Sequence, residues 1–240
     1  MMRSFLIGFG GGLLALTPAA AQSPAEEEVA IQVEGQTKPQ RASVAQFREA
    51  QRAFLKFRPL LAPASSLAYE IIASNKSGVT AANIDSIRLS LVSKDNRIPL
   101  VIDDKHQFVM PDLLTLGGDY RLFANAGKKP IYIAPRVFSP GTSKADLRLG
   151  DVRLTCQIGW AYYKSEIPII FRAGFGLIGG CNSKRIALLN RLPKPLASVT
   201  MSDRGKTVPL PINPKFPNAY RVPIYDKKLS NDARIVAIFK

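Results

Sequence analysis

The stretch Ile98-Pro99-Leu100-Val101-Ile102-Asp103 returns later in the chain as Val208-Pro209-Leu210-Pro211-Ile212-Asn213. In both copies a β-branched residue, Pro and Leu are followed two residues later by Ile. Proline has no backbone N–H to give to a ladder, so inside a sheet it is confined to edge strands or strand starts. Each stretch therefore predicts an edge strand or a strand start within a β structure.

The match extends to both sides of these stretches and keeps its order, with two residues inserted in the second copy. The matched positions are Leu89 and Leu91 with Val199 and Met201, residues 108–111 with 220–223, and residues 119–124 with 232–237. Ordered self-similarity of this kind is typical of a repeated structural unit. We expect two related β modules at residues 59–140 and 141–240, with the same strand order over residues 82–126 and 195–239.

Other segments are short, often alternate between apolar and polar residues, and are bounded by Gly, Pro, Asn or Ser, as half-buried strands are. The predicted strands lie at residues 69–72, 87–91, 119–123 and 147–154. They do not alternate with long helical patterns, which disfavours a parallel sheet with crossover helices. The predicted fold class is mainly β: two related β-sandwich-like modules preceded by one amphipathic helix.

The run Asp104-Lys105-His106-Gln107-Phe108, followed by Gly118-Asp119-Tyr120-Arg121-Leu122, resembles a known family pattern. It is similar to the Asp-x-x-Gly-x-Phe … Gly-x-Tyr-x-Leu rhythm of carboxypeptidase-regulatory-like, transthyretin-type sandwiches. The chain departs from that pattern because Lys105-His106-Gln107 lacks the Gly, and Ala233 stands where the second copy would have Tyr. The resemblance implies a β-sandwich that acts as an accessory or binding unit and carries no catalytic residues.

One helix is predicted at residues 43–58, with Ser43 as its N-cap. Its apolar residues follow a single helical stripe: Phe47, Ala50, Phe54, Phe57 and Leu61. Arg48, Arg52 and Lys56 fall on the opposite face. Pro59 disfavours helical geometry at Arg58 and should end the helix there. A basic amphipathic helix can lie on a membrane surface, dock in a partner's groove, or pack on its own domain, which is the commonest case.

The first residues predict export. Arg3 is followed by an apolar run from Phe5 to Leu16 and then by small residues up to Ala21. This order is the signature of a secretory signal peptide, which we place at residues 1–21, and the apolar run is too short for a spanning helix. Residues 22–42 are polar and acidic, and we expect a disordered leader there. The expected location is periplasmic or extracellular.

The only cysteines, Cys156 and Cys181, both lie in the exported part. In an oxidising compartment an even pair of cysteines predicts a disulfide. The loop it would close spans 25 positions, and closing it would stabilise the fold by roughly 3 kcal/mol. A catalytic or metal-binding thiol would need partners, and the chain has one histidine, His106.

Positive charge is concentrated in the last quarter of the chain. Arg3 leaves with the signal, so the remaining chain has 32 Lys and Arg against 18 Asp and Glu, a net charge of +14. Residues 181–240 have a net charge of +9, since their only acids are Asp203, Asp226 and Asp232. A field of this kind attracts polyanions and anionic surfaces, or only keeps a protein in solution. The anion-binding candidates are Arg48, Arg52, Lys56, Lys184, Arg185, Arg191, Lys194, Arg204, Lys206, Lys227 and Lys228.

Two motifs bear on enzymatic chemistry. Residues 174–179 fit the G-x-G-x-x-G of dinucleotide-binding folds and follow a plausible strand at residues 167–171. That motif needs a helix to open at its end, and Gly180-Cys181-Asn182 follows here instead, so we expect a glycine-rich turn and no cofactor. His106 would have to serve any Ser–His–acid triad, yet no Gly-x-Ser-x-Gly elbow exists, and a polar hairpin turn is favoured.

The favoured function is that of a non-enzymatic secreted envelope protein that binds or scaffolds an anionic partner. That partner would be a lipid headgroup, an envelope glycan or an acidic protein, and contact with a membrane surface is one form it could take. The alternative is a secreted hydrolase with an unrecognised site of dispersed acidic residues and His106. A nucleic-acid partner is disfavoured, because the compartment is wrong and no known motif is present.

Overall fold

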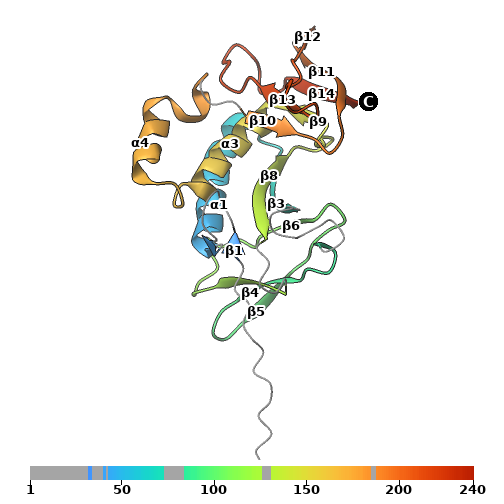
Figure 1. The fold of residues 1–240 in the computed structure, drawn as a ribbon. Helices are drawn as coiled ribbons and strands as arrows, with labels where there is room; N and C mark the ends of the chain where they lie inside the picture. The colour runs from blue at the N-terminus through green and yellow to red at the C-terminus, as the bar shows by residue number, and fades with distance from the viewer. Residues whose placement is uncertain (1–31, 34–39, 42, 73–83, 126–130, 185–187) are drawn as a thin grey trace, which may run out of the picture.

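The computed structural model describes residues 32–33, 40–41, 43–72, 84–125, 131–184 and 188–240 (Figure 1). The predicted signal peptide lies outside these residues. Of the predicted leader, the structure describes only two short strands, β1 (Gln32–Val33) and β2 (Gln40–Arg41). These two strands pair antiparallel. The described part of the chain is mainly β in antiparallel sheets, with an amphipathic helix on its N-terminal side, as the sequence predicts.

The N-terminal half contributes two three-stranded sheets, ordered β6-β3-β8 and β5-β4-β7. Their strands are β3 (Ser66–Ile72), β4 (Leu89–Val92), β5 (Arg97–Leu100), β6 (Gln107–Phe108), β7 (Arg121–Ala124) and β8 (Tyr132–Phe138). The C-terminal half contributes a four-stranded sheet, ordered β12-β11-β14-β9, and the pair β10-β13. Its strands are β9 (Asp146–Arg148), β10 (Leu188–Arg191), β11 (Leu196–Asp203), β12 (Lys206–Pro209), β13 (Ala219–Val222) and β14 (Arg234–Phe239).

The two segments that match in sequence pair their strands in the same way. In each, a hairpin is extended by a third strand beside its first strand, giving the orders β5-β4-β7 and β12-β11-β14. Leu91 lies opposite Ile98 on one side and Leu122 on the other. The matched residues of the second segment take the same places, with Met201 opposite Val208 and Ile235. The register of pairing therefore agrees at three matched positions, and Pro99 and Pro209 both lie in the outer strand.

Helix α1 (Val44–Leu61) begins where the sequence predicts. The Ser43 hydroxyl accepts from the Ala45 N–H, and the Gln46 side chain accepts from the Ser43 N–H. Phe47 and Ala50 are fully buried. The predicted end at Arg58 is wrong, because the helix continues through Pro59 to Leu61. Its last turn is held by tertiary contacts: Asn231 donates to the Leu60 carbonyl, and Leu61 packs on the core.

The predicted strand at residues 147–154 is also wrong beyond its first residues. Strand β9 ends at Arg148, and helix α3 (Leu149–Tyr163) begins at once. Over eight residues the apolar positions 147, 149, 152 and 154 alternate almost as a strand does, but continued to residue 162 they follow helical spacing.

The buried carboxylate of Asp151, in the first turn of α3, accepts hydrogen bonds from the Ser139 N–H and hydroxyl at 3.0 and 2.7 Å.

Helix α3 contributes side chains to two hydrophobic cores. The first core is built by α1 and the N-terminal sheets, and the second by the C-terminal sheets. The side chains that α3 gives to the first core are Leu154, Ile158 and Tyr162, and those it gives to the second are Leu149, Val152 and Cys156. Figure 1 shows α3 beside α1, between the sheets of the two halves. Residues 149–163 therefore belong to both cores, although the sequence assigns them to the second module alone.

Glu166, just after α3, is expected to oppose folding at neutral pH. Gln46 donates to one of its carboxylate oxygens, and the other oxygen is buried without a hydrogen-bond partner. Burial raises the pKa of Glu166 above its ordinary 4.5. The folded protein therefore keeps this proton to a higher pH than the unfolded chain, so stability is full below the unfolded pKa and declines as pH rises through the folded pKa.

The variant Glu166→Gln keeps an oxygen for Gln46 and removes the ionisation. We expect it to be more stable than the wild type at pH 7, by less than about 1 kcal/mol because the site is partly exposed. Below the ordinary pKa of 4.5 the difference should vanish. Urea unfolding at both pH values measures this. A variant less stable than the wild type at pH 7 would contradict the assignment.

Candidate docking surface

The segment predicted as a strand followed by a glycine-rich turn is a helix. Helix α4 (Ile169–Leu177) includes Gly174 and Gly176, and only Gly179, with φ +89°, and Gly180 form a turn, which leads into the short 3-10 helix η1 (Gly180–Asn182). The predicted strand at residues 167–171 is therefore wrong. Proline at 168 and the apolar residues after it are equally compatible with the first turn of a helix. With no strand before the glycines and only the three-residue η1 after them, this segment lacks the strand and α-helix that a dinucleotide-binding phosphate loop needs.

No residue of α4 is buried. Its large apolar side chains are exposed by 77% at Ile169, 74% at Ile170, 67% at Phe171 and 88% at Leu177. Figure 1 shows α4 standing away from the sheets, beyond α3. Scattered single apolar residues on a surface are normal, but a contiguous apolar patch marks an interaction site.

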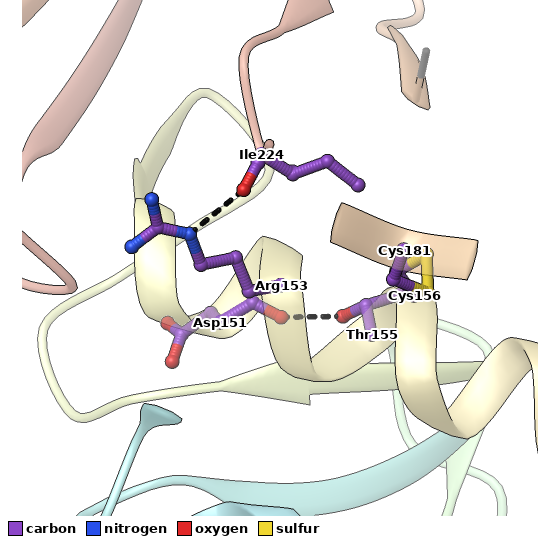
Figure 2. Close-up of a disulfide and its surroundings, with 6 residues drawn as sticks. All are labelled: Asp151, Arg153, Thr155, Cys156, Cys181 and Ile224. Carbon is purple, nitrogen blue, oxygen red and sulfur yellow. Dashed lines mark hydrogen bonds between the residues drawn. A yellow bond between two sulfur atoms is a disulfide. The ribbon is translucent and has the colours of Figure 1, made fainter. Parts of the chain in front are cut away.

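Two contacts fix α4 to α3. Cys156 of α3 is bonded to Cys181 of η1, with the two Cα atoms 6.0 Å apart, so the predicted pairing is found (Figure 2). One turn further along α3, the indole of Trp160 stacks on the Phe175 ring with 3.8 Å between centroids and 14° between planes. At about 100° per residue, Ile170 and Leu177 share a face roughly opposite Phe175. The helix thus rests on Phe175 and presents its aliphatic side chains outward.

Cations lie on this helix and in two segments that follow it in the chain. Arg172 is on α4 itself and is exposed. Lys184, just after the disulfide, lies over the ring of Tyr225 at 5.9 Å. Lys227 and Lys228 are exposed in the same loop as Tyr225. Between Ile167 and Ser202 the sequence has no Asp or Glu. We call α4 together with Arg172, Lys184, Lys227 and Lys228 the docking surface.

Arg153 of α3 holds the loop that carries Lys227 and Lys228. Its guanidinium donates to the carbonyls of Ile224, Asp226 and Leu229 and to the side chain of Asn231. Figure 2 shows the Arg153 side chain reaching Ile224, while Cys156 one turn further on meets Cys181. Burial lowers the pKa of Arg153, and nearby Asp226 and Asp203 act in the opposite direction. Helix α3 thus positions both parts of the docking surface.

The structure brings together only some of the predicted anion-binding residues. Lys184, Lys227 and Lys228 lie on the docking surface, whereas Arg185 lies outside the described residues. Several others already have partners within the chain: Arg48 donates to the carbonyls of Leu113 and Gly118, Arg52 pairs with Glu49, Lys56 lies over Phe57, and Arg191 lies over Phe216. Lys194, Arg204 and Lys206 are exposed on or beside β11 and β12.

Sequence reasoning missed α4, Arg172, Arg153 and Tyr225 as parts of a site. The available signal was the apolar run at residues 167–178, interrupted by Arg172 and followed by a cysteine. The sequence predicts a strand at the start of this run, and its 12 residues are too few to span a membrane. Within the described residues, no helix is long and apolar enough to cross a membrane.

His106 lies in a polar turn with φ +60°. The predicted hairpin is wrong, because β5 and β6 on either side of this turn belong to different sheets. Asp103 accepts from the backbone of Lys105 and Gln107, and the imidazole Nε2 lies 3.1 Å from a carboxylate oxygen of Asp85. Among the described residues, no group of three or more His, Cys, Asp or Glu side chains could hold a metal ion. An open cleft of about 670 Å³ lies away from His106, between residues 92–96 and 117–123, and its lining carries charges of both signs.

Comparison of the chain with family models, with curated proteins and with solved structures finds no match. The resemblance to transthyretin-type sandwiches therefore stays an expectation. The function has to be inferred from the docking surface and its chemistry.

Proposed function

We propose that this protein is a non-enzymatic envelope protein that binds an anionic partner through the docking surface. The observation that carries the proposal is an exposed apolar helix that includes Arg172 and is followed by Lys184, in a stretch of 36 residues, 167–202, without a single acid. Clustered charge of one sign attracts and orients an oppositely charged partner. Evenly scattered lysines and arginines would serve solubility alone.

The disulfide and the predicted signal peptide support an oxidising compartment outside the cytoplasm. Disulfides persist in oxidising environments, and Cys156 and Cys181 are bonded. We therefore propose a periplasmic or extracellular location. The anions available there are lipid headgroups, envelope glycans and acidic proteins.

The two matched β segments are proposed to be related copies that serve as a scaffold. Both use the same strand order, and the residues opposite Leu91 occupy positions equivalent to those opposite Met201. The disulfide, α4 and the loop with Lys227 and Lys228 all lie in the second half. In this proposal the first copy supports the fold, and the second has acquired the docking surface.

The test is binding at low and high salt. The variant K184Q/K227Q/K228Q removes three cations of the docking surface, and the matched control K94Q/K105Q/R121Q removes three exposed cations of the first half. Probes are phosphatidylglycerol vesicles, dextran sulfate and polyglutamate. We expect wild-type affinity for at least one probe to fall about tenfold or more between about 30 and 300 mM salt, since exposed charges are screened over a shorter distance at higher salt.

We expect the docking-surface variant to lose most of this low-salt affinity and the control variant to keep it. Equal losses in the two variants would mean that net charge alone acts, and the docking surface would be rejected. Absence of salt-sensitive binding to all three probes would reject the function itself.

A further inference from the structure

We infer that the anionic partner is the surface of a lipid bilayer, and that α4 enters its interfacial region. This inference rests on the proposed function and narrows it to one partner. Interfacial helices place apolar and aromatic side chains among the acyl chains and keep basic residues at the headgroups. The residues of α4 and its surroundings meet both requirements.

The exposed side chains of α4 are the wrong kind for a glycan. Ile169, Ile170 and Leu177 are aliphatic, and a glycan offers hydroxyl groups and little apolar surface to cover them. Aliphatic side chains gain free energy only in a phase that excludes water. The hydrocarbon boundary of a bilayer is such a phase, and it needs no preformed groove to receive the helix.

Charge argues against a second copy of the chain as the occupant. The chain has a formal net charge of +15. Two docking surfaces face to face would bring Arg172, Lys184, Lys227 and Lys228 of one copy close to the same residues of the other. Like charges so arranged repel, whereas a leaflet rich in phosphatidylglycerol complements them.

The anchoring of α4 suits insertion. A free peptide of nine residues is too short to be a stable helix in water. Here the disulfide and the Trp160–Phe175 stack hold the segment as a helix before any lipid is present. The conformational entropy of ordering the helix is therefore lost during folding, and lipid binding does not have to supply it.

The only tryptophan of the chain provides a native probe. Trp160 stacks on the inner face of α4, so its fluorescence reports what happens to that helix. The experiment mixes the protein with vesicles of phosphatidylglycerol and phosphatidylethanolamine, and measures binding by flotation and by quenching of Trp160 with brominated lipids. Vesicles of phosphatidylcholine provide the uncharged comparison.

The informative variant is I170S/L177S, which replaces two outward side chains of α4. The matched control is V101S/V109S, because Val101 and Val109 are as exposed but lie in the first half. None of the four residues is buried, so all variants should keep the fold, which thermal unfolding verifies. We expect I170S/L177S to bind anionic vesicles about thirtyfold or more weakly, with loss of Trp160 quenching, and the control to bind as the wild type does.

The two hypotheses fail in different ways. If I170S/L177S binds anionic vesicles as tightly as the wild type while binding stays salt-sensitive, the proposed function stands and insertion of α4 is wrong. If the wild type binds dextran sulfate or polyglutamate but not the vesicles, the partner is a glycan or an acidic protein, and the bilayer is rejected. If nothing binds, both are wrong.

Discussion

Gly150→Ala is expected to lower the free energy of unfolding by about 4 kcal/mol or more, and so to leave little folded protein at 37 °C. A Cβ at this position would lie 2.0 Å from the backbone carbonyl oxygen of Leu61 and 3.0 Å from that of Asn231. Both are backbone atoms at points where three segments meet. The Gly150 N–H donates to the Asn231 carbonyl, and the Asn231 side chain donates to Leu60. The end of α1 and the start of α3 would have to separate to admit one methyl group.

Gly159→Ala is the matched control in the same helix. A Cβ there meets nothing within 4 Å. Alanine is a better helix former than glycine, so this change should leave stability unchanged or raise it by up to about 1 kcal/mol. Chemical denaturation of both variants measures their free energies of unfolding. Similar stability of the two variants would mean that the segments around Gly150 move apart readily.

Replacing both cysteines by serine is expected to cost about 3 kcal/mol of unfolding free energy, because the Cys156–Cys181 bond restricts the unfolded chain across a separation of 25 residues. Both side chains are buried in the second core, so serine adds the cost of burying two hydroxyl groups. The pair C156A/C181A separates the two contributions, since alanine adds no polar group.

The same change should loosen α4. Without the disulfide, the stack of Trp160 on Phe175 still joins α4 to α3, and a single partly buried aromatic pair is worth about 1 kcal/mol. We therefore expect the Trp160 emission of the double variants to shift toward that of a solvated indole, even where the rest of the protein stays folded. Unchanged emission together with unchanged stability would remove the disulfide from this role.

Local chemistry explains what the sequence could predict. Ser43 and the stripe beginning at Phe47 define the start of α1, because capping and helical spacing act within a few residues. The matched stretches around Pro99 and Pro209 predict two hairpins with equivalent registers, since alternation and turn positions are also local. The disulfide could be predicted from the number of cysteines and the expected oxidising compartment alone.

What failed depended on contacts between distant segments. The end of α1 is set by Asn231, which lies far away in the sequence. Eight residues from Leu147 were too few to distinguish a strand from the first turns of α3. Most of all, the apolar run of α4 reads as core in the sequence, and only the fold leaves it exposed. The docking surface combines α4 with a loop some fifty residues further on, which no local pattern could connect.

The position of α3 between two cores has a consequence for the order in which the chain can fold. The first core is built from residues of Val44 to Val137, but it closes only when Leu154, Ile158 and Tyr162 reach it. A chain that emerges from its N-terminus, whether from a ribosome or through a membrane, offers these residues late. The apolar faces of the N-terminal sheets stay uncovered until α3 has emerged and packs against them. The first core therefore closes only after about two thirds of the 240 residues have emerged, and we expect a chain stalled before Tyr162 to bind chaperones.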